Sequence, residues 1–227
     1  AGAINAYSTI RGASNDVQSV SGTLTLSAKA LKGSQAELCQ LMWDLIQHVR
    51  FDELPRIREL ITQARARREQ SITGSGHSLA MAAASAGMSP SAKLTHQLSG
   101  LEGIKSIKAL DDSLKDDVQL QAFADKLHAI HQLILTSNKQ YLLVGETEQL
   151  EQYQSSIESI WRDDNNSTDA GFSLPPVQAQ IKQGWITNTQ VNFCAKAYPS
   201  VNVEHEDAPA LSVLSGVLRN GYLHRTI

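Results

Sequence analysis

The sequence predicts an α+β fold in which helices pack on one face of a mostly antiparallel sheet. Two observations lead to this prediction. Residues 3–10 and 20–31 look like strands, and in Ser21 to Ala28 small polar and apolar side chains alternate with the period of two that strands show. Several segments with helical spacing then follow one another along the chain. Strands grouped ahead of helices, rather than alternating with them, are typical of α+β layers.

The first two helices are predicted from capping signals. Ser34 and Glu37 have the spacing of a capping box just ahead of an apolar run. Asp52 is a suitable N-cap for a second helix, because Pro55 then falls in the first turn, where no intrahelical N–H bond is lost. The first helix should bury one apolar stripe. That stripe consists of Leu38, Leu41, Met42, Leu45, Ile46 and Val49.

The second helix should break at Thr73-Gly74-Ser75-Gly76-His77, because two glycines in three residues disfavour a continuous helix. A helix of small residues over 80–86 would follow, and Ser89-Pro90 would begin the next one. Residues 11–16 should form a hairpin loop, and residues 163–176, without periodicity, an interdomain linker. The remaining predicted elements are helices over 113–136, 147–161 and 209–227 and strands over 141–145 and 184–198.

Composition narrows the classes of function. The chain has 227 residues, of which 41% are apolar and 19% charged, which is ordinary for a globular protein. A net charge of −3 disfavours nucleic acid as a partner, and no apolar run approaches the roughly 20 residues that span a bilayer. Cys39 and Cys194 are expected to be free thiols. Both ends look cut, so we expect a segment of a longer protein.

Several motifs together resemble a known family. They are Phe51-Asp52-Glu53, Ser71 to His77, Met88-Ser89-Pro90-Ser91-Ala92 and Leu98-Ser99-Gly100-Leu101. In this order and spacing they resemble the third homologous domain of presequence proteases, a branch of the insulinase/pitrilysin-type zinc metallopeptidases. Residues 218–227 resemble a helix early in the fourth domain of the same proteins.

The resemblance implies an architecture and a chemistry. Such peptidases carry four homologous α+β domains, arranged as two halves that close around a chamber. Residues 1–163 would be most of the third domain, 164–176 a linker and 177–227 a truncated start of the fourth. Zinc would be held in the first domain by His-x-x-Glu-His and a distant Glu, which leaves one position open for water. The motif Glu would act as general base, and an Arg and a Tyr of the fourth domain would reach the substrate.

This sequence departs from that catalytic pattern. None of its seven histidines belongs to a His-x-x-Glu-His arrangement. They are His48, His77, His96, His128, His131, His205 and His224. We therefore expect no catalytic residue and no metal ligand in this chain, and zinc only in the full-length enzyme.

The expected function is a non-catalytic, chamber-forming segment of a zinc endopeptidase that degrades unstructured peptides. Its partners would be the N-terminal half of the same polypeptide and peptide substrates, in a cytoplasm or an organelle matrix, with self-association through the truncated end as a further expectation. The alternative is a non-catalytic partner or assembly subunit of the same fold family. An unrelated helical α+β binding module is a third interpretation.

Four residues form the candidate site. Gly74, Ser75, Gly76 and His77 could make a substrate-facing turn, although a break that lets two segments pack closely explains the glycines as well. His128 and His131 have a chelating spacing without an accompanying Glu, so a structural pair is the favoured interpretation. The acidic cluster Glu204 to Asp207 is interpreted as the start of a helix. The basic cluster Arg65 to Arg68 is interpreted as a solvated helix face.

Overall fold

The computed structural model describes residues 4–161 and 172–226. The chain divides into two units. The first unit contains residues 1–9, 22–66 and 107–171, and the second contains residues 10–21, 67–106 and 172–227. Both units are therefore discontinuous in sequence, and each is described by itself below. The domain boundaries expected from the sequence, 1–163 and 177–227, stay a prediction.

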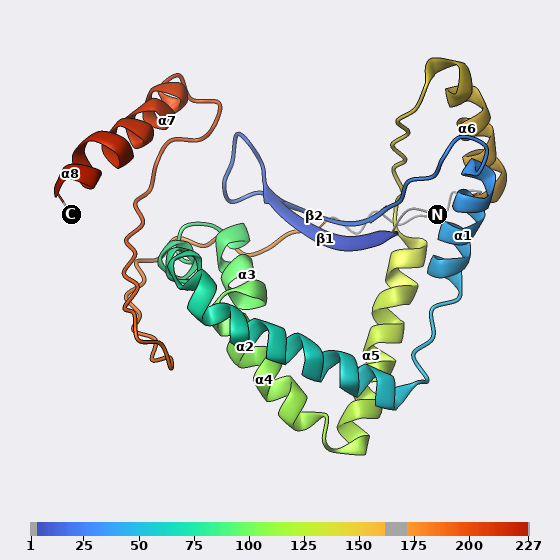
Figure 1. Ribbon diagram of the computed structural model, residues 1–227, viewed down its shortest axis with the longest axis horizontal. Helices are drawn as coiled ribbons and strands as arrows, with labels where there is room; N and C mark the ends of the chain where they lie inside the picture. Colours follow the sequence, from blue (N-terminus) through green and yellow to red (C-terminus); the bar gives the residue numbers. More distant parts are fainter. Residues whose placement is uncertain (1–3, 162–171, 227) are drawn as a thin grey trace. The chain divides into compact units, whose positions relative to one another are not determined.

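Two strands form the sheet of the described residues. β1 spans Asn5–Gly12 and β2 spans Val20–Ser27, and they pair as a two-stranded hairpin (Figure 1). A loop as short as residues 13–19 requires the two strands to be antiparallel. The amide of Gln18 donates to Oδ1 of Asp16 at 2.9 Å inside this loop, which is a turn that aspartate favours. The predicted hairpin is thus confirmed, with its loop a few residues later than expected.

Helices make up most of the regular structure. α1 spans Gln35–Gln47, α2 Leu54–Ser85, α3 Pro90–Ser99, α4 Leu101–Ser113, α5 Asp117–Thr136 and α6 Thr147–Ile160. α7 spans Ala208–Val217, and a π-helical turn, Leu218–Leu223, leads into α8, His224–Thr226. Figure 1 shows the helices along the chain. The fold is α+β only in a loose sense, because helices dominate and the sheet of the described residues has two strands.

Side-chain caps explain where two helices begin. The hydroxyl of Ser89 accepts a hydrogen bond from the amide of Ala92, and Pro90 occupies the first turn of α3. The carboxylate of Asp116 accepts from the amides of Val118 and Gln119 at the start of α5. The predicted start of α3 is confirmed. α5 begins at Asp117, later than the predicted residue 113, because α4 extends to Ser113 and a turn over 114–116 separates the two helices.

Two predicted strands are absent from the described residues. Residues 141–145 and 184–198 carry no strand, although both contain alternating or apolar side chains. A strand needs a hydrogen-bonded neighbour, and the sheet contains only β1 and β2. Leu142 and Val144 are 89% and 88% exposed, so the first of these segments is not buried either.

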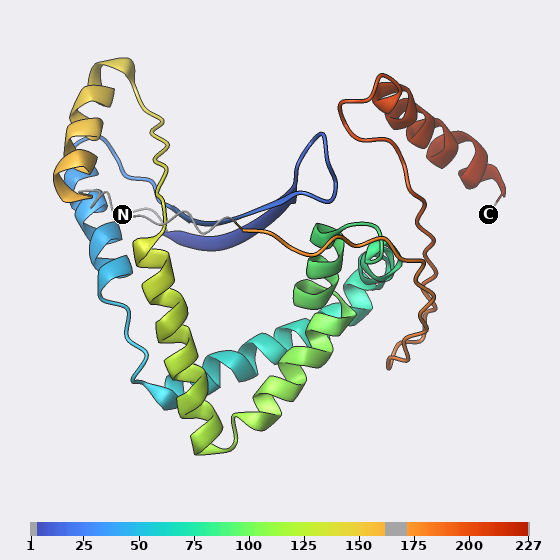
Figure 2. The same ribbon diagram turned by 180° about the vertical axis from the view of Figure 1, so that it is seen from behind.

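In the first unit, α1 and α6 lie side by side in both views (Figures 1 and 2). The rings of Trp43 and Trp161 meet edge to face, with ring centroids 5.1 Å apart. The side-chain amide of Gln35 also donates to the hydroxyl of Tyr153 at 2.8 Å. The predicted burial of the α1 stripe is wrong, because α1 has no buried residue and Leu45 is 48% exposed. One neighbouring helix covers part of α1 and leaves the rest open.

A small core lies in each unit. In the first unit, Leu114, Leu120 and Ala124 are almost completely buried where α4 ends and α5 begins. In the second unit, the core joins the C-terminal half of α2 to α3 and α4. Its buried apolar members are Leu79, Ala83, Ala86 and Ile104.

The final helices expose their apolar side chains. Leu214 is 47% exposed and Val217 is 59% exposed, although both were predicted to face inward. The predicted helix over 209–227 begins at Ala208 and loses α-helical geometry at Leu218, where the π-turn begins. Among the described residues, no helix is both long and apolar enough to cross a bilayer.

Candidate functional site

The four candidate residues lie within α2 rather than in a separate turn. α2 consists of two helical stretches that meet at a kink at Ser75, whose φ of −121° and ψ of 16° are not helical. The predicted interruption of the helix at 73–77 is thus confirmed, as a kink rather than a loop. Gly76 is buried, whereas Gly74 and His77 are exposed, so these residues do not converge on one site.

Gly76 allows a close approach of another segment of the second unit. A Cβ atom added at Gly76 would lie 2.2 Å from Cε2 of Phe193. At Gly74, in contrast, an added Cβ would meet nothing within 4 Å. The phenyl ring therefore packs directly on the backbone of α2, beside the distortion at Ser75. This contact supports the structural interpretation of the glycines, while a substrate-facing role for residues 74–77 stays a prediction.

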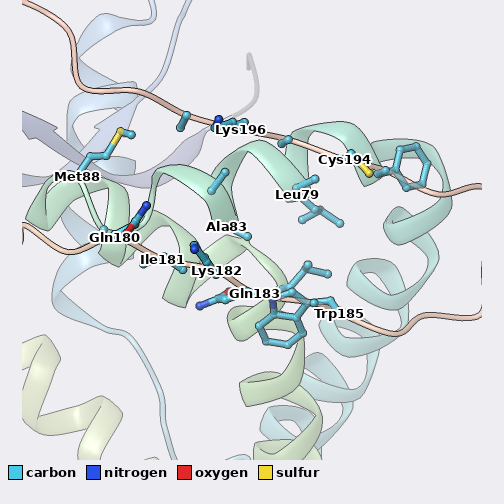
Figure 3. A pocket seen from close by; sticks show the side chains of 18 of the residues that line it. Leu79, Ala83, Met88, Gln180, Ile181, Lys182, Gln183, Trp185, Cys194 and Lys196 are labelled. Carbon is cyan, nitrogen blue, oxygen red and sulfur yellow. Dashed lines mark hydrogen bonds between the residues drawn. The ribbon is translucent and has the colours of Figure 1, made fainter.

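The same contact forms part of a groove of about 1680 Å³ in the second unit. One wall is the C-terminal half of α2, and the other is the irregular segment 178–201 (Figure 3). The amide of Ala179 donates to the carbonyl of Gly87 at 2.8 Å and holds the start of this segment against the end of α2. An added Cβ at Gly87 would lie 2.0 Å from the carbonyl oxygen of Ala179, so a side chain there would clash with backbone.

The charged lining of the groove is entirely basic. Lys182 and Lys196 line it, and no Asp or Glu of the described residues does. Figure 3 shows the two lysines on separate stretches of the extended segment, which pass the α2 residues Leu79 and Ala83. The ammonium group of Lys196 lies 4.8 Å from the ring centroid of Tyr198, a cation–π distance. The chain as a whole has a net negative charge, so the charge of the groove lining is opposite to the net charge of the chain.

His96 is buried beside the groove, and neither of its ring nitrogens has a hydrogen-bond partner among the described residues. Its ring meets Trp185, which lines the groove, at a centroid distance of 5.9 Å. Nε2 of His96 lies 3.9 Å from Oε1 of Glu102, which is too far for a hydrogen bond. Burying an unpaired polar group costs stability.

The other histidines do not assemble into a metal site. Nε2 of His131 lies 2.7 Å from the carbonyl oxygen of Ile46, and its ring packs against Phe51. The ring of His128 packs against the same phenylalanine, at a centroid distance of 5.9 Å. Among residues 4–161 and 172–226, no group of three His, Cys, Asp or Glu side chains could hold a metal ion. The donor set of zinc peptidases, three protein ligands with one open position, therefore has no match there.

Two side chains of the acidic cluster before α7 accept hydrogen bonds, one from within the cluster and one from the loop between β1 and β2. Nδ1 of His205 accepts a hydrogen bond from the amide of Asp207, and Glu204 accepts one from the hydroxyl of Ser14. Asp207 stands at the N-cap of α7 but makes no side-chain capping bond.

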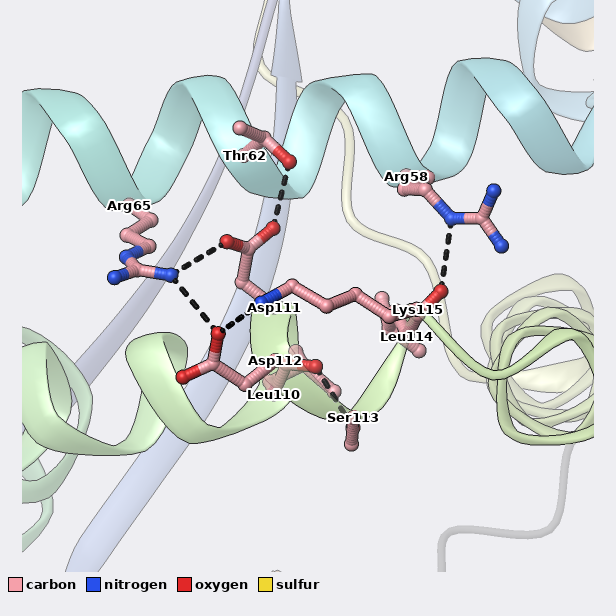
Figure 4. Close-up of polar contacts among 9 residues, drawn as sticks. All are labelled: Arg58, Thr62, Arg65, Leu110, Asp111, Asp112, Ser113, Leu114 and Lys115. Carbon is pink, nitrogen blue, oxygen red and sulfur yellow. Dashed lines mark hydrogen bonds and ion pairs between the residues drawn. The ribbon is translucent and has the colours of Figure 1, made fainter.

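A buried polar network in the first unit was missed by sequence reasoning (Figure 4). The hydroxyl of Thr62 donates to Asp111 at 2.6 Å, and Arg65 donates to the same carboxylate at 2.8 Å. These two donors, with the hydroxyl the stronger cause, lower the pKa of Asp111. The network joins α2 to α4. Arg65 is only 23% exposed, so the interpretation of Arg65 to Arg68 as a solvated face is wrong for this residue.

The groove was missed as well. Its extended wall was predicted as a strand, with no ligand assigned to it. One signal in the sequence could have indicated it, because residues 170–203 contain Lys182 and Lys196 and no Asp or Glu.

Comparison with known proteins agrees with the resemblance in the motifs. Residues 1–110 match the family "Peptidase M16-C associated". A mitochondrial presequence protease of Drosophila melanogaster is 28% identical over 92% of this chain and 20% of its own length. One of Yarrowia lipolytica is 26% identical over 82% of the chain and 19% of its own length. Protein HypA of Clostridium perfringens is 25% identical over 90% of the chain and 21% of its own length. The chain thus spans about a fifth of these relatives.

Proposed function

Because this chain is a distant homologue of the presequence proteases, with a peptidase-associated family matched over residues 1–110, we propose that it is a non-catalytic, chamber-forming segment of a zinc-dependent endopeptidase. In this proposal the whole enzyme degrades unstructured peptides. Its zinc is held by the N-terminal half of the same polypeptide, which is the partner of this segment. The helices would pack on one face of a larger antiparallel sheet, to which β1 and β2 belong. The compartment would be an organelle matrix or a cytoplasm.

One observation carries the proposal. The likeness to presequence proteases extends over most of the chain, yet the sequence contains no His-x-x-Glu-His motif. A segment that keeps the family resemblance without the metal-binding motif is suited to enclosing and holding substrate. It is not equipped to activate a zinc-bound water, which requires two histidines and a carboxylate around the metal.

The first test is the zinc content of the purified chain after incubation with zinc and dialysis. We expect negligible retained zinc and no chelator-sensitive cleavage of an unstructured fluorogenic peptide. One tightly held zinc per chain, or cleavage that a chelator abolishes, would overturn the proposal. A variant with both His128 and His131 changed to Ala serves as the control, because those side chains have the chelating spacing.

The coding sequence around these residues provides the second test. A His-x-x-Glu-His motif upstream, together with Arg and Tyr codons downstream, is what the proposal requires. A coding sequence without the motif in any part would instead favour a non-catalytic partner or assembly subunit of the same fold family.

A further inference from the structure

The extended wall of the groove leaves its backbone open for pairing. Within residues 180–200, all of which the structure describes, no backbone amide donates a hydrogen bond to a backbone group of another described residue. Exposed backbone donors and acceptors in a non-helical segment are a template to which a second extended chain can add as a strand. The bond from Ala179 to Gly87 fixes one end of this template against α2.

The side chains around the template suit alternating contacts. Ile186 is fully exposed and Val191 is 58% exposed, and both line the groove. On the opposite wall, Ala80, Ala83 and Gly87 are small and leave room beside the backbone. In strand addition, the paired backbones supply affinity, and the pockets for alternate side chains supply selectivity. Apolar side chains every second residue would therefore be accepted here.

Charge indicates which chain would be accepted. Lys182 and Lys196 are the charged side chains that line the groove among the described residues. A carboxylate on an incoming peptide would be attracted to both, whereas a basic peptide would be repelled. A second copy of this chain is disfavoured for the same reason, because pairing through the same segment would bring lysines against lysines.

We propose that this groove binds extended peptide segments that carry acidic residues, by strand addition to one of the two stretches of residues 180–200 that flank the bends at 188–191. The inference deepens the proposed function, since it names the class of peptide that this segment would hold. The test of this inference needs neither zinc nor hydrolysis, so the inference and the proposed function can fail separately.

Cys194 provides a probe inside the groove. It lines the groove and its side chain is exposed, whereas Cys39 is half-buried. A Cys39→Ala variant therefore carries a single reporter thiol. The rate of alkylation of Cys194 is measured while peptide is titrated, and a bound peptide should slow it. Three eight-residue peptides are compared, all with alternating Val and Thr. The first carries two Glu, the second has Lys in place of both, and the third keeps the Glu residues but has Pro at two positions.

We expect the Glu peptide to protect Cys194 at low salt and to bind about tenfold more tightly than the Lys peptide, with the difference decreasing as salt is added. The Pro peptide should bind weakly, because proline has no N–H to donate to a ladder. Lys182→Glu together with Lys196→Glu should reverse the preference between the Glu and Lys peptides. Lys108→Glu, on the exposed surface of α4, is the matched control and should leave the preference for the Glu peptide unchanged.

Three outcomes would overturn the inference. They are equal binding of the Glu and Lys peptides, undiminished binding of the Pro peptide, and protection of Cys194 that rises with chain concentration alone. The last would show that a second copy occupies the groove. Far-ultraviolet circular dichroism of every variant confirms that the fold is kept. If binding fails while the chain retains no zinc and cleaves nothing, only this inference fails. If binding holds while the chain retains zinc, only the proposed function fails.

Discussion

The contact between Gly76 and Phe193 predicts the steric cost of placing a methyl group on this part of α2. Gly76→Ala places a methyl group where Cε2, Cδ2 and Cζ of the ring would lie 2.2, 2.4 and 2.6 Å away. Ordinary contacts are at 3.4–4 Å, so the ring must move by more than about 1 Å. Forcing an extra methyl group into a packed position costs about 1–3 kcal/mol. Replacing glycine by alanine in a helix gains about 0.8–1 kcal/mol.

Gly74→Ala is the matched control two residues earlier on α2. The new methyl group meets nothing within 4 Å there, so only the helix-propensity gain remains. We expect Gly74→Ala to raise the free energy of unfolding by about 0.8–1 kcal/mol. Subtracting the free energies of unfolding of the two variants cancels the helix-propensity gain and leaves the steric cost. We expect Gly74→Ala to be more stable than Gly76→Ala by about 1–3 kcal/mol.

Urea unfolding followed by circular dichroism at a helix wavelength measures both variants. A third variant, Phe193→Ala, completes a double-mutant cycle with Gly76→Ala. In that background the steric cost should vanish, and Gly76→Ala should become stabilising. If Gly76→Ala and Gly74→Ala stabilise the wild-type chain equally, the ring does not pack on α2 and the described wall of the groove is wrong.

Three further predictions concern buried polar groups. Thr62→Val removes the hydroxyl that donates to Asp111 while keeping shape and a similar helix propensity, so it should lower the free energy of unfolding by about 1.5–3 kcal/mol in urea titrations; a loss below about 0.5 kcal/mol would contradict this role. Because the pKa of Asp111 is lowered in the folded state, its stabilising contribution is present above the usual carboxyl pKa of about 3.9 and is lost as the pH falls through the lowered value. Acid titration of unfolding should therefore show a smaller loss for Thr62→Val than for the wild type, and parallel curves would refute that linkage. His96→Leu should leave stability unchanged or raise it by about 1 kcal/mol, because the ring nitrogens are buried without partners among the described residues; a clear loss would indicate that His96 has a partner, with Glu102 the nearest candidate.

Local sequence signals predicted most of the helices and the hairpin. Capping residues and periodicity are local properties, so α6 and the start of α3 were located closely, and β1 and β2 within a few residues, whereas α4 was not predicted. The interruption predicted at 73–77 is a kink at Ser75, between Gly74 and Gly76. Each glycine disfavours a continuous helix by about 1 kcal/mol, and that signal is local in the sequence as well.

The errors arise where structure depends on distant partners. The segments 141–145 and 184–198 have strand-like patterns, but a pattern does not provide a neighbouring strand, and none pairs with them among the described residues. Arg65 was assigned to solvent because its neighbours are basic, whereas its partner Asp111 is 46 residues away in the chain. The groove combines α2 with residues 178–201, and no local pattern reports that combination.

The irregular wall of the groove has a consequence for the chain's own lifetime. A protease must hold its substrate in an extended form, and most of a folded chain has to open locally before it can be cut. Residues 180–200 donate no backbone hydrogen bond to the backbone of residues 4–161 or 172–226, so opening there breaks few bonds and costs little. Trypsin should therefore cut after Lys182 and Lys196 well before it cuts within α2 or α5. By its conformation, this segment of a peptidase relative is more readily nicked by a peptidase than the helices that the structure describes.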